Sequence, residues 1–331
     1  MRRHRLGRRK FLALIGGAPA WPLAARAQPN SMPVIGALFS ASHAGSWLPA
    51  EAAFRQGLRD KGYIEGQNAR IESRWAENQY DRLPALAADL VRHDAAVIVA
   101  FATPAARAAR AATATIPIVF TTISDPVQIG FVSSLSRPGG NLTGVSLLSV
   151  EVGPKLLELL HAAAPSARSL ALLINPTNPN ADVQSKTLQV AAQRLGIQLH
   201  SVNASTIAEF DPAFARVREL NAGALLIAQD VLFNTETRRL AELARRHAIP
   251  AAYPDRDFAE AGGLMSYGAD LRDAFRQAGI YAGRILKGEK PADLPVIQAS
   301  KLQLIVNLKT AKAIGLPLSA DMVSIADEVI E

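Results

Sequence analysis

The sequence contains no cysteine among its 331 residues. Disulfide bonds, thiolate metal sites, a cysteine nucleophile and a lipid anchor on cysteine are therefore excluded. The histidines are dispersed, without the HxH or HExxH spacing of zinc sites, so the sequence indicates no metal site. Nor does the chain contain about 18 consecutive apolar residues, the run expected of a membrane-spanning helix.

An excess of basic charge is also missing from most of the chain. The formal net charge is +7, from 36 Lys and Arg against 29 Asp and Glu. Seven of the basic residues lie within residues 1–27, which carry no acidic residue, so residues 28–331 are balanced. A nucleic-acid-binding face needs a local excess of Lys and Arg. We therefore expect no nucleic-acid partner.

Residues 1–27 have the pattern of an export signal rather than of a folded element. A basic start is followed by an apolar stretch, Phe11–Leu23, which glycine and proline interrupt and which is too short to span a bilayer. Residues 7–12 resemble the twin-arginine export motif, and Ala25-Arg26-Ala27 fits a cleavage site. We predict cleavage near Ala27 and a soluble periplasmic product; a disordered basic tail is the alternative.

Beyond residue 32, short apolar runs alternate with longer amphipathic ones, which predicts α/β architecture with parallel sheets. The expected strands are 34–39, 69–75, 96–101, 118–121, 142–146, 170–174, 198–202, 224–228, 251–253, 264–267 and 302–306. The expected helices are 48–61, 81–92, 104–112, 126–135, 180–195, 208–220, 234–247, 255–261, 271–287 and one from 309.

The same strand and helix order occurs twice. Gly62 ends the first helix of one half, and Gly196 ends the first helix of the other. An Ile-Pro pair opens the fourth strand in both halves, at residues 116–117 and 249–250. These matches predict two similar lobes.

Ligands of open parallel sheets bind beyond the carboxyl ends of the strands. The loops expected there are rich in hydroxyl, amide, carboxylate and aromatic side chains. The candidate ligand-binding residues are Ser40, Ser42, Trp47, Thr103, Pro104, Thr122, Asp125, Asn178, Asp230, Phe233, Tyr253 and Tyr267.

Several of these candidates have a structural alternative. An Asp before a helix caps it, and capping alone is the favoured interpretation of Asp125 and Asp255. Thr103 fits a cap and a ligand site equally, because a free helix N-terminus attracts a carboxylate. Asp230 differs, since three apolar residues separate it from the helix that we expect Asn234 to cap. We therefore predict that Asp230 is free to pair with a cation.

The aromatic candidates have alternatives of the same kind. Phe39, Phe101 and Phe233 are more typical of a core, whereas Trp47, Tyr253 and Tyr267 fit stacking on a ligand or local packing.

Catalytic and cofactor motifs are missing. Residues 137–144 have the glycine spacing of a phosphate loop but lack the Lys-Ser/Thr that completes it. The first strand is followed by residues without the glycine-rich dinucleotide motif, and no G-x-S-x-G is present. We expect no cofactor and no enzyme activity.

Several sequence stretches resemble one known family. They are AAFRQGL at 52–58, GYIEGQN at 62–68, YDRLP at 80–84, IPIVF at 116–120, DPV at 125–127, RPGGNLTG at 137–144, NPTNP at 175–179, GGLMSYG at 262–268 and NLKTAK at 307–312. Through them the chain from residue 28 resembles the periplasmic substrate-binding proteins of ABC transporters, in the branch with tryptophan- and tyrosine-binding members.

The resemblance implies a type I periplasmic-binding-protein fold, in which two Rossmann-like lobes are joined by a three-segment hinge. Lobe 1 would comprise residues 28–146 and about 268–295, and lobe 2 residues 147–267 and about 296–331. The chain would cross between lobes near Leu147, Gly268 and Pro295.

The ligand, an amino-acid-like solute or an aromatic carboxylate, would bind between the lobes as the hinge closes. Its carboxylate would lie near Ser42 and Thr103, its ammonium near Asp230, and its apolar part against Trp47, Phe233 or Tyr253.

The implied partners are an ABC permease and its ATPase, which a monomeric receptor would supply with the solute. Two other functions stay open. One is a ligand sensor for a membrane receptor kinase. The other is an exported hydrolase with Asp230 or Asp125 as base, for which the sequence offers no nucleophile–base pair.

Overall fold

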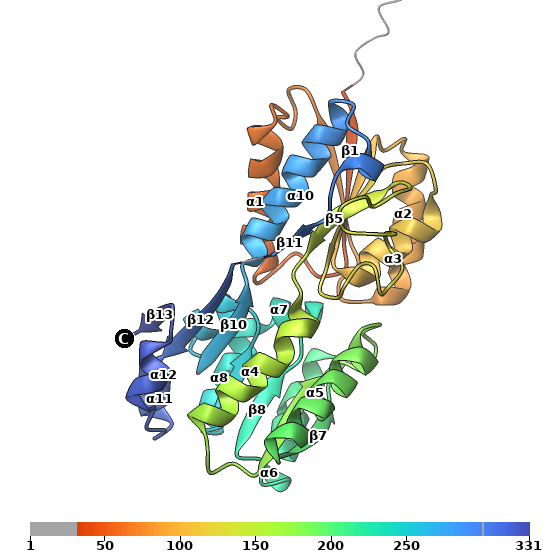
Figure 1. Ribbon diagram of the computed structural model, residues 1–331. Helices are drawn as coiled ribbons and strands as arrows, with labels where there is room; N and C mark the ends of the chain where they lie inside the picture. Colours follow the sequence, from red (N-terminus) through yellow and green to blue (C-terminus); the bar gives the residue numbers. More distant parts are fainter. Residues whose placement is uncertain (1–31, 300) are drawn as a thin grey trace, which may run out of the picture. The chain divides into compact units, whose positions relative to one another are not determined.

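The computed structural model describes residues 32–299 and 301–331 (Figure 1). The export signal and cleavage site predicted within residues 1–27 lie outside the described residues. Within the described ranges, no helix combines the length and the apolar character needed to cross a membrane.

Six parallel strands form the first sheet, in the order β11-β5-β4-β3-β1-β2. Their bounds are β1 Val34–Phe39, β2 Arg70–Trp75, β3 Val97–Phe101, β4 Ile118–Thr122, β5 Leu142–Ser146 and β11 Ile297–Gln298. Strands β1 and β3 carry no polar side chain and are buried along their whole length, because helices cover both faces of the sheet. We call this sheet the first lobe, together with its helices α1 Trp47–Asp60, α2 Leu83–Arg92, α3 Thr103–Ala112 and α10 Leu271–Leu286 and the 3-10 helices η1 Tyr80–Arg82 and η3 Pro291–Asp293.

Seven strands form the second sheet, in the order β13-β12-β10-β9-β8-β6-β7. Their bounds are β6 Ser169–Ile174, β7 Gln198–Asn203, β8 Ala224–Ile227, β9 Ala251–Tyr253, β10 Met265–Ala269, β12 Leu302–Asn307 and β13 Glu328–Ile330. The pairs are parallel except for β10 and β12. We call this sheet the second lobe, together with α4 Ser149–Ala163, α5 Ala181–Leu195, η2 Ile207–Glu209, α6 Phe210–Glu219, α7 Val231–Thr235, α8 Thr237–Arg246, α9 Arg256–Glu260, α11 Leu308–Ala313 and α12 Ala320–Ser324.

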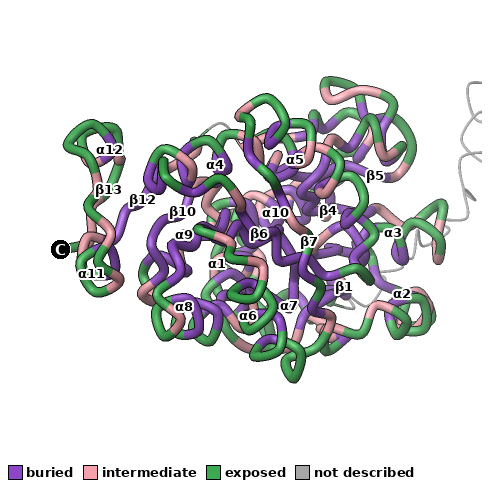
Figure 2. Tube along the Cα trace, turned by 90° about the horizontal axis from the view of Figure 1, so that it is seen from below, coloured by how far each residue is buried: buried purple, intermediate pink, exposed green. Residues whose placement is uncertain are grey.

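The strand order β2-β1-β3-β4-β5 of the first lobe recurs as β7-β6-β8-β9-β10 in the second. This repetition confirms the prediction of two parallel α/β lobes. Buried residues, purple in Figure 2, concentrate on the strands, while the helices turn exposed faces outward. In the first lobe, Phe101 stacks between Phe39 and Phe275, with ring centroids 4.5 and 4.2 Å apart, so Phe39 and Phe101 are core residues as predicted.

Helix α10 follows the second-lobe strand β10 but packs on α1 of the first lobe (Figure 1). Two glycines allow the helices to approach closely. A Cβ on Gly57 would collide with the Arg276 carbonyl oxygen, and one on Gly279 with that of Phe54. A segment late in the sequence is thereby fixed to the first lobe.

The last strand of the first sheet lies next to the crossing that the resemblance implies near Pro295. Its residues Ile297 and Gln298 pair with β5. Hydrogen bonds hold this stretch in place: the Thr143 hydroxyl donates to the Leu294 carbonyl at 2.7 Å, and the Tyr281 hydroxyl donates to that of Pro295 at 2.7 Å.

Two helix predictions were wrong, and helix α4 was not predicted. Residues 126–135 form turns instead of a helix, because Gly130 has a left-handed backbone (φ 71°). Helix α4 was missed, because Gly153 and Pro154 interrupt its apolar pattern. The helix expected from Asn234 is split into α7 and α8, and α7 begins earlier, directly after Asp230.

Candidate ligand-binding site

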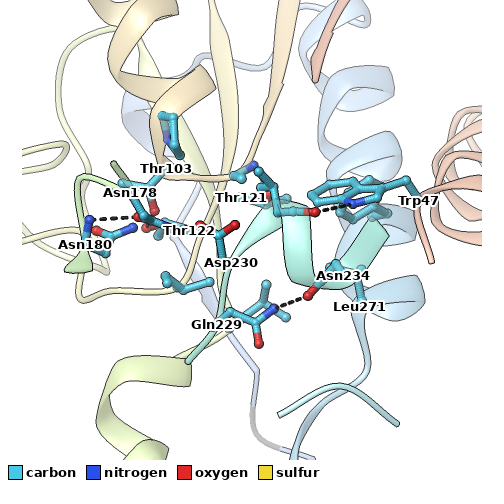
Figure 3. Close-up of a pocket in the computed structure, with 16 residues that line it drawn as sticks. Trp47, Thr103, Thr121, Thr122, Asn178, Asn180, Gln229, Asp230, Asn234 and Leu271 are labelled. Carbon is cyan, nitrogen blue, oxygen red and sulfur yellow. Dashed lines mark hydrogen bonds between the residues drawn. The ribbon is translucent and has the colours of Figure 1, made fainter. Parts of the chain in front are cut away.

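A cavity lies where the carboxyl ends of the strands of both lobes meet (Figure 3). It leaves about 30 Å³ for the centres of water molecules, which is room for only a few of them. Its lining comes from both lobes and consists of Trp47, Ala102, Thr103, Pro104, Thr121, Thr122, Ile123, Leu147, Asn178, Asn180, Gln229, Asp230, Val231, Asn234, Leu271 and Phe275.

The first lobe contributes hydroxyl groups and a helix N-terminus. The hydroxyls of Thr103, the first residue of α3, and Thr122, the last residue of β4, lie 2.9 Å apart and are both buried. Ala102, with φ 73°, precedes α3 and provides no side-chain cap. The Ser40 hydroxyl instead accepts from the Ala105 amide of the first turn at 3.1 Å, so an anionic group would meet the helix dipole but not that N–H.

The second lobe contributes a carboxylate. Asp230 is buried, and its Oδ1 accepts from the Leu232 amide at 2.8 Å and from Asn175 Nδ2 at 3.2 Å. Its Oδ2 accepts from Asn178 Nδ2 at 2.6 Å and from the Tyr80 hydroxyl at 2.9 Å. The prediction that Asp230 is free of capping was wrong, because the bond from Leu232 makes it the N-cap of α7.

Asp230 is the one ionisable residue among the described residues that line the cavity. Burial raises the pKa of its carboxyl, and the hydrogen bonds from Asn178 and Asn175 act in the opposite direction. With four donors around it, the carboxylate has partners in its charged form. The negative charge of Asp230 suits a ligand with a cationic group, although the four acceptor positions of the carboxylate already have donors.

Amide groups complete the second-lobe side of the cavity. The Asn180 backbone N–H donates to Asn178 Oδ1 at 2.8 Å, which orders the entry to α5. Gln229 Nε2 donates to Asn234 Oδ1 at 3.1 Å (Figure 3). Gln229 Oε1 is buried and accepts no hydrogen bond from the residues that the structure describes.

Apolar side chains line one side of the cavity. Trp47 is buried, packs against Phe275 with ring centroids 5.7 Å apart, and donates from Nε1 to the Val231 carbonyl at 3.3 Å. Leu271 of α10 lies on the same side (Figure 3). This wall offers a surface for an aromatic or aliphatic side chain.

Half of the residues predicted from the sequence line the cavity. They are Trp47, Thr103, Pro104, Thr122, Asn178 and Asp230.

Two of the predicted serines have structural bonds outside the cavity lining. The Ser40 hydroxyl donates to the Phe101 carbonyl at 3.2 Å and accepts from the Ala105 amide at 3.1 Å, which fixes the start of α3. The Ser42 hydroxyl accepts from Asn78 Nδ2 at 2.8 Å.

The remaining predicted residues also lie outside the lining. Asp125 Oδ1 accepts from the Val127 amide at 2.8 Å and orders a turn. Phe233 is fully buried in the second-lobe core, and Tyr267 packs against the other core of that lobe. Tyr253 does not line the cavity; its hydroxyl donates to the Asp230 carbonyl at 3.1 Å and also contacts Asn234.

Several residues that line the cavity were not among the predicted ligand-binding residues. Thr121, Asn180 and Gln229 neighbour predicted residues and lie in the same strand-end loops, so a wider reading of those loops includes them. Leu271 and Phe275 come from α10, and no local pattern connects that helix with the first lobe.

Side chains of the two lobes touch around the cavity. Besides the Tyr80–Asp230 and Trp47–Val231 bonds, the Ser124 hydroxyl donates to Asn180 Oδ1 at 3.2 Å. A Cβ on Gly45 of the first lobe would collide with the Thr235 backbone of the second. The lobes are therefore closed on each other.

Two repeated α/β lobes with a cavity between their strand ends define a solute-binding protein. The family model for ABC transporter substrate binding proteins matches residues 40–330, and the chain belongs to this family. The family is one of periplasmic or extracellular proteins that bind small molecules and work with an ABC permease. The protein is therefore a solute-binding protein and not an enzyme, which rules out the hydrolase alternative.

Known relatives agree with this assignment. The chain is 31% identical over 275 residues to a tyrosine-binding protein of Clostridioides difficile (strain R20291), covering 82% of this chain and 78% of the relative. It superposes with a TM-score of 0.80 on an ABC domain from Streptococcus pneumonia solved in complex with L-Trp, at 25% identity, covering 91% of this chain and all of that one. The fold is the type I periplasmic-binding-protein fold, as predicted.

A substrate-binding protein of Clostridium difficile in a ligand-free, open form gives a lower TM-score of 0.63, at 27% identity, covering 90% of this chain and 99% of that one. Because its identity nearly equals that of the L-Trp complex, sequence divergence does not account for the difference in TM-score. The lower score accords with the closed contacts between the lobes of this chain.

Proposed function

We propose that the protein captures a zwitterionic amino acid with an aromatic or large aliphatic side chain and delivers it to an ABC permease. One observation carries the proposal: the cavity has a carboxylate on one rim, hydroxyls with a helix N-terminus on the other, and an apolar wall between them. Among its described lining residues there is no lysine or arginine, so a ligand with a large net negative charge is disfavoured.

The carboxylate of the ligand binds near Thr103 and Thr122, at the N-terminus of α3. Hydroxyl donors and the helix dipole together stabilise an anion there without a full positive charge on the protein. The sequence suggested Ser42 as a second partner of the ligand, and we replace it by Thr122, because Ser42 lies outside the cavity lining.

The ammonium group binds at the Asp230 carboxylate, beside the Asn178 amide. Trp47, Phe275 and Leu271 contact the side chain of the ligand, and Trp47 offers the largest flat surface. The relative that binds tyrosine and the structural neighbour with bound L-Trp support this ligand class.

Capture and delivery both require that the lobes move apart, because the cavity of the closed form has room for only a few water molecules. In this proposal the chain crosses between lobes after β5, after β10 and after β11, and those crossings form the hinge. We also propose twin-arginine-type export into the periplasm and a monomeric receptor, both from the sequence.

Thermal unfolding of the chain from residue 28 with single ligands tests the proposal. L-tryptophan, L-tyrosine, L-phenylalanine and L-leucine are compared with indole-3-propionate, which lacks the ammonium, and with L-tryptophanamide, which lacks the carboxylate. A ligand at a hundredfold excess over its Kd stabilises the folded state by about 2.7 kcal/mol. We expect a shift for at least one amino acid and a much smaller shift for its two analogues. Stabilisation by a sugar or a dicarboxylate, with none by amino acids, would overturn the proposal.

A further inference from the structure

One hydrogen bond between the lobes ends on the carboxylate of the site itself. Tyr80 belongs to η1 of the first lobe, and its hydroxyl lies 2.9 Å from Asp230 Oδ2 of the second lobe. Tyr80 is absent from the cavity lining, whereas Asp230 belongs to it.

The partners of Asp230 divide by lobe. The donors from Leu232, Asn175 and Asn178 lie in the second lobe and accompany Asp230 wherever that lobe moves. The Tyr80 hydroxyl alone, among the described donors to this carboxylate, comes from the first lobe. Separating the lobes removes that donor from a carboxylate oxygen, and bonds to a charged acceptor are the stronger kind.

The phenol is held in its donating form. Burial, and after it the Asp230 charge, raise the pKa of Tyr80 well above its usual value, so the hydroxyl keeps its proton. Aromatic and aliphatic residues of the first lobe surround its ring, which fixes its direction.

We propose that Tyr80 is a positioning residue that couples ligand capture to closure, because its hydroxyl completes the hydrogen bonds of Asp230 only when the lobes meet. The identity of the ligand in this inference rests on the proposed function; the effect of Tyr80 on closure does not.

Lobe closure can be measured directly, because the chain has no native cysteine. Spin labels on Thr115→Cys of the first lobe and Gln193→Cys of the second, both exposed positions, report the distance between lobes. The pair is introduced into the wild type, into Tyr80→Phe and into Tyr281→Phe. Tyr281 is the matched control, since its hydroxyl donates at 2.7 Å to the Pro295 carbonyl within the first lobe.

We expect Tyr80→Phe to move the distance distribution toward longer separations, without ligand or with L-tryptophan. The dissociation rate of L-tryptophan should rise by about tenfold, while the association rate changes little. Tyr281→Phe should lower the melting temperature but leave distances and rates unchanged.

Distances in Tyr80→Phe equal to those of the wild type, with and without ligand, would overturn the inference. So would identical changes in the two variants, since they would show a general loss of stability. If no amino acid binds the wild type, the proposed function fails, and the ligand-free distances still decide the role of Tyr80.

Discussion

The first lobe meets the cavity with hydroxyls and a helix N-terminus, whereas the second meets it with a carboxylate and amides. The two contributions come from equivalent places, because β3 and β8 are the third strands of the two repeats. After β3, Ala102 has no side chain that can cap α3, and the Ala105 amide of the first turn bonds to the Ser40 hydroxyl. After β8, Asp230 caps α7 and brings a negative charge to the same topological position. One residue before a helix thus decides whether a strand end attracts an anion or a cation.

The largest loss of ligand affinity is expected from a substitution that keeps the two lobes from closing. Gly45→Ala places a Cβ against the Thr235 backbone, so the lobes cannot close fully. We expect the affinity for L-tryptophan to fall by about a hundredfold, as closure ceases to favour the bound state. Isothermal titration calorimetry measures the change.

Gly66→Ala is the matched control for Gly45→Ala. Gly66 also has a positive φ, 78°, but a Cβ there meets nothing within 4 Å. Its variant therefore shares the backbone strain without the collision. Equal losses of affinity in the two variants would show that strain, and not blocked closure, causes the effect.

The second prediction removes the charge that distinguishes the second lobe. Asp230→Asn keeps a side chain that can cap α7 but cannot pair with an ammonium ion. We expect the affinity for L-tryptophan to fall by about tenfold or more, with little change for indole-3-propionate. Calorimetry on both ligands checks this, and an equal loss for the two would move the ammonium site away from Asp230.

A smaller change is expected from the hydroxyls of the first lobe. Thr122→Val removes a hydroxyl at the cavity and should lower the affinity for L-tryptophan by about fivefold. L-tryptophanamide, which lacks the carboxylate, should be affected less. In the control Thr143→Val, a buried hydroxyl that donates to Leu294 is lost outside the cavity, and affinity should not change. If calorimetry shows equal losses of affinity for L-tryptophan and L-tryptophanamide, the ligand carboxylate does not bind near Thr122.

The last prediction separates a structural aspartate from a ligand-binding one. Asp255 caps α9, as the sequence favoured, and does not line the cavity. Burial, and then the Asp257 charge, raise the pKa of Asp255 to about 7, while Arg272 lowers it and Asp270 raises it. Folded protein therefore holds a proton that unfolded protein releases near pH 4, and this contribution to stability is lost between about pH 4 and 7.

Asp255→Asn lacks that titration. Relative to the wild type it should gain about 1–3 kcal/mol in the free energy of unfolding as pH rises from 4 to 8. Its affinity for L-tryptophan should be unchanged. Urea unfolding at several pH values measures the first effect; parallel stability curves for the two proteins would contradict it.

Strand positions could be predicted from the sequence because the strands are apolar runs that glycine and proline delimit, as in β1 and β5. Helix α4 was not, since Pro154 lies inside it and the surrounding packing outweighs the local signal. In the site, Thr103 and Asp230 follow strands and were found by that rule. Phe275 and Tyr80 reach the site through tertiary packing and interlobe contact, for which a single sequence holds no local pattern.

The packing of α10 on α1 also determines the order in which the chain can fold. Residues that complete the first lobe, including Phe275 between the strands and α1, leave the ribosome more than 200 residues after α1 itself. Until then the apolar side of α1 has no covering helix, and the second lobe is also incomplete, because β12 and β13 follow α10 in the sequence. The first lobe, although its synthesis begins first, is therefore completed only after most of the second lobe has been made, and its assembly requires closure of a long chain loop.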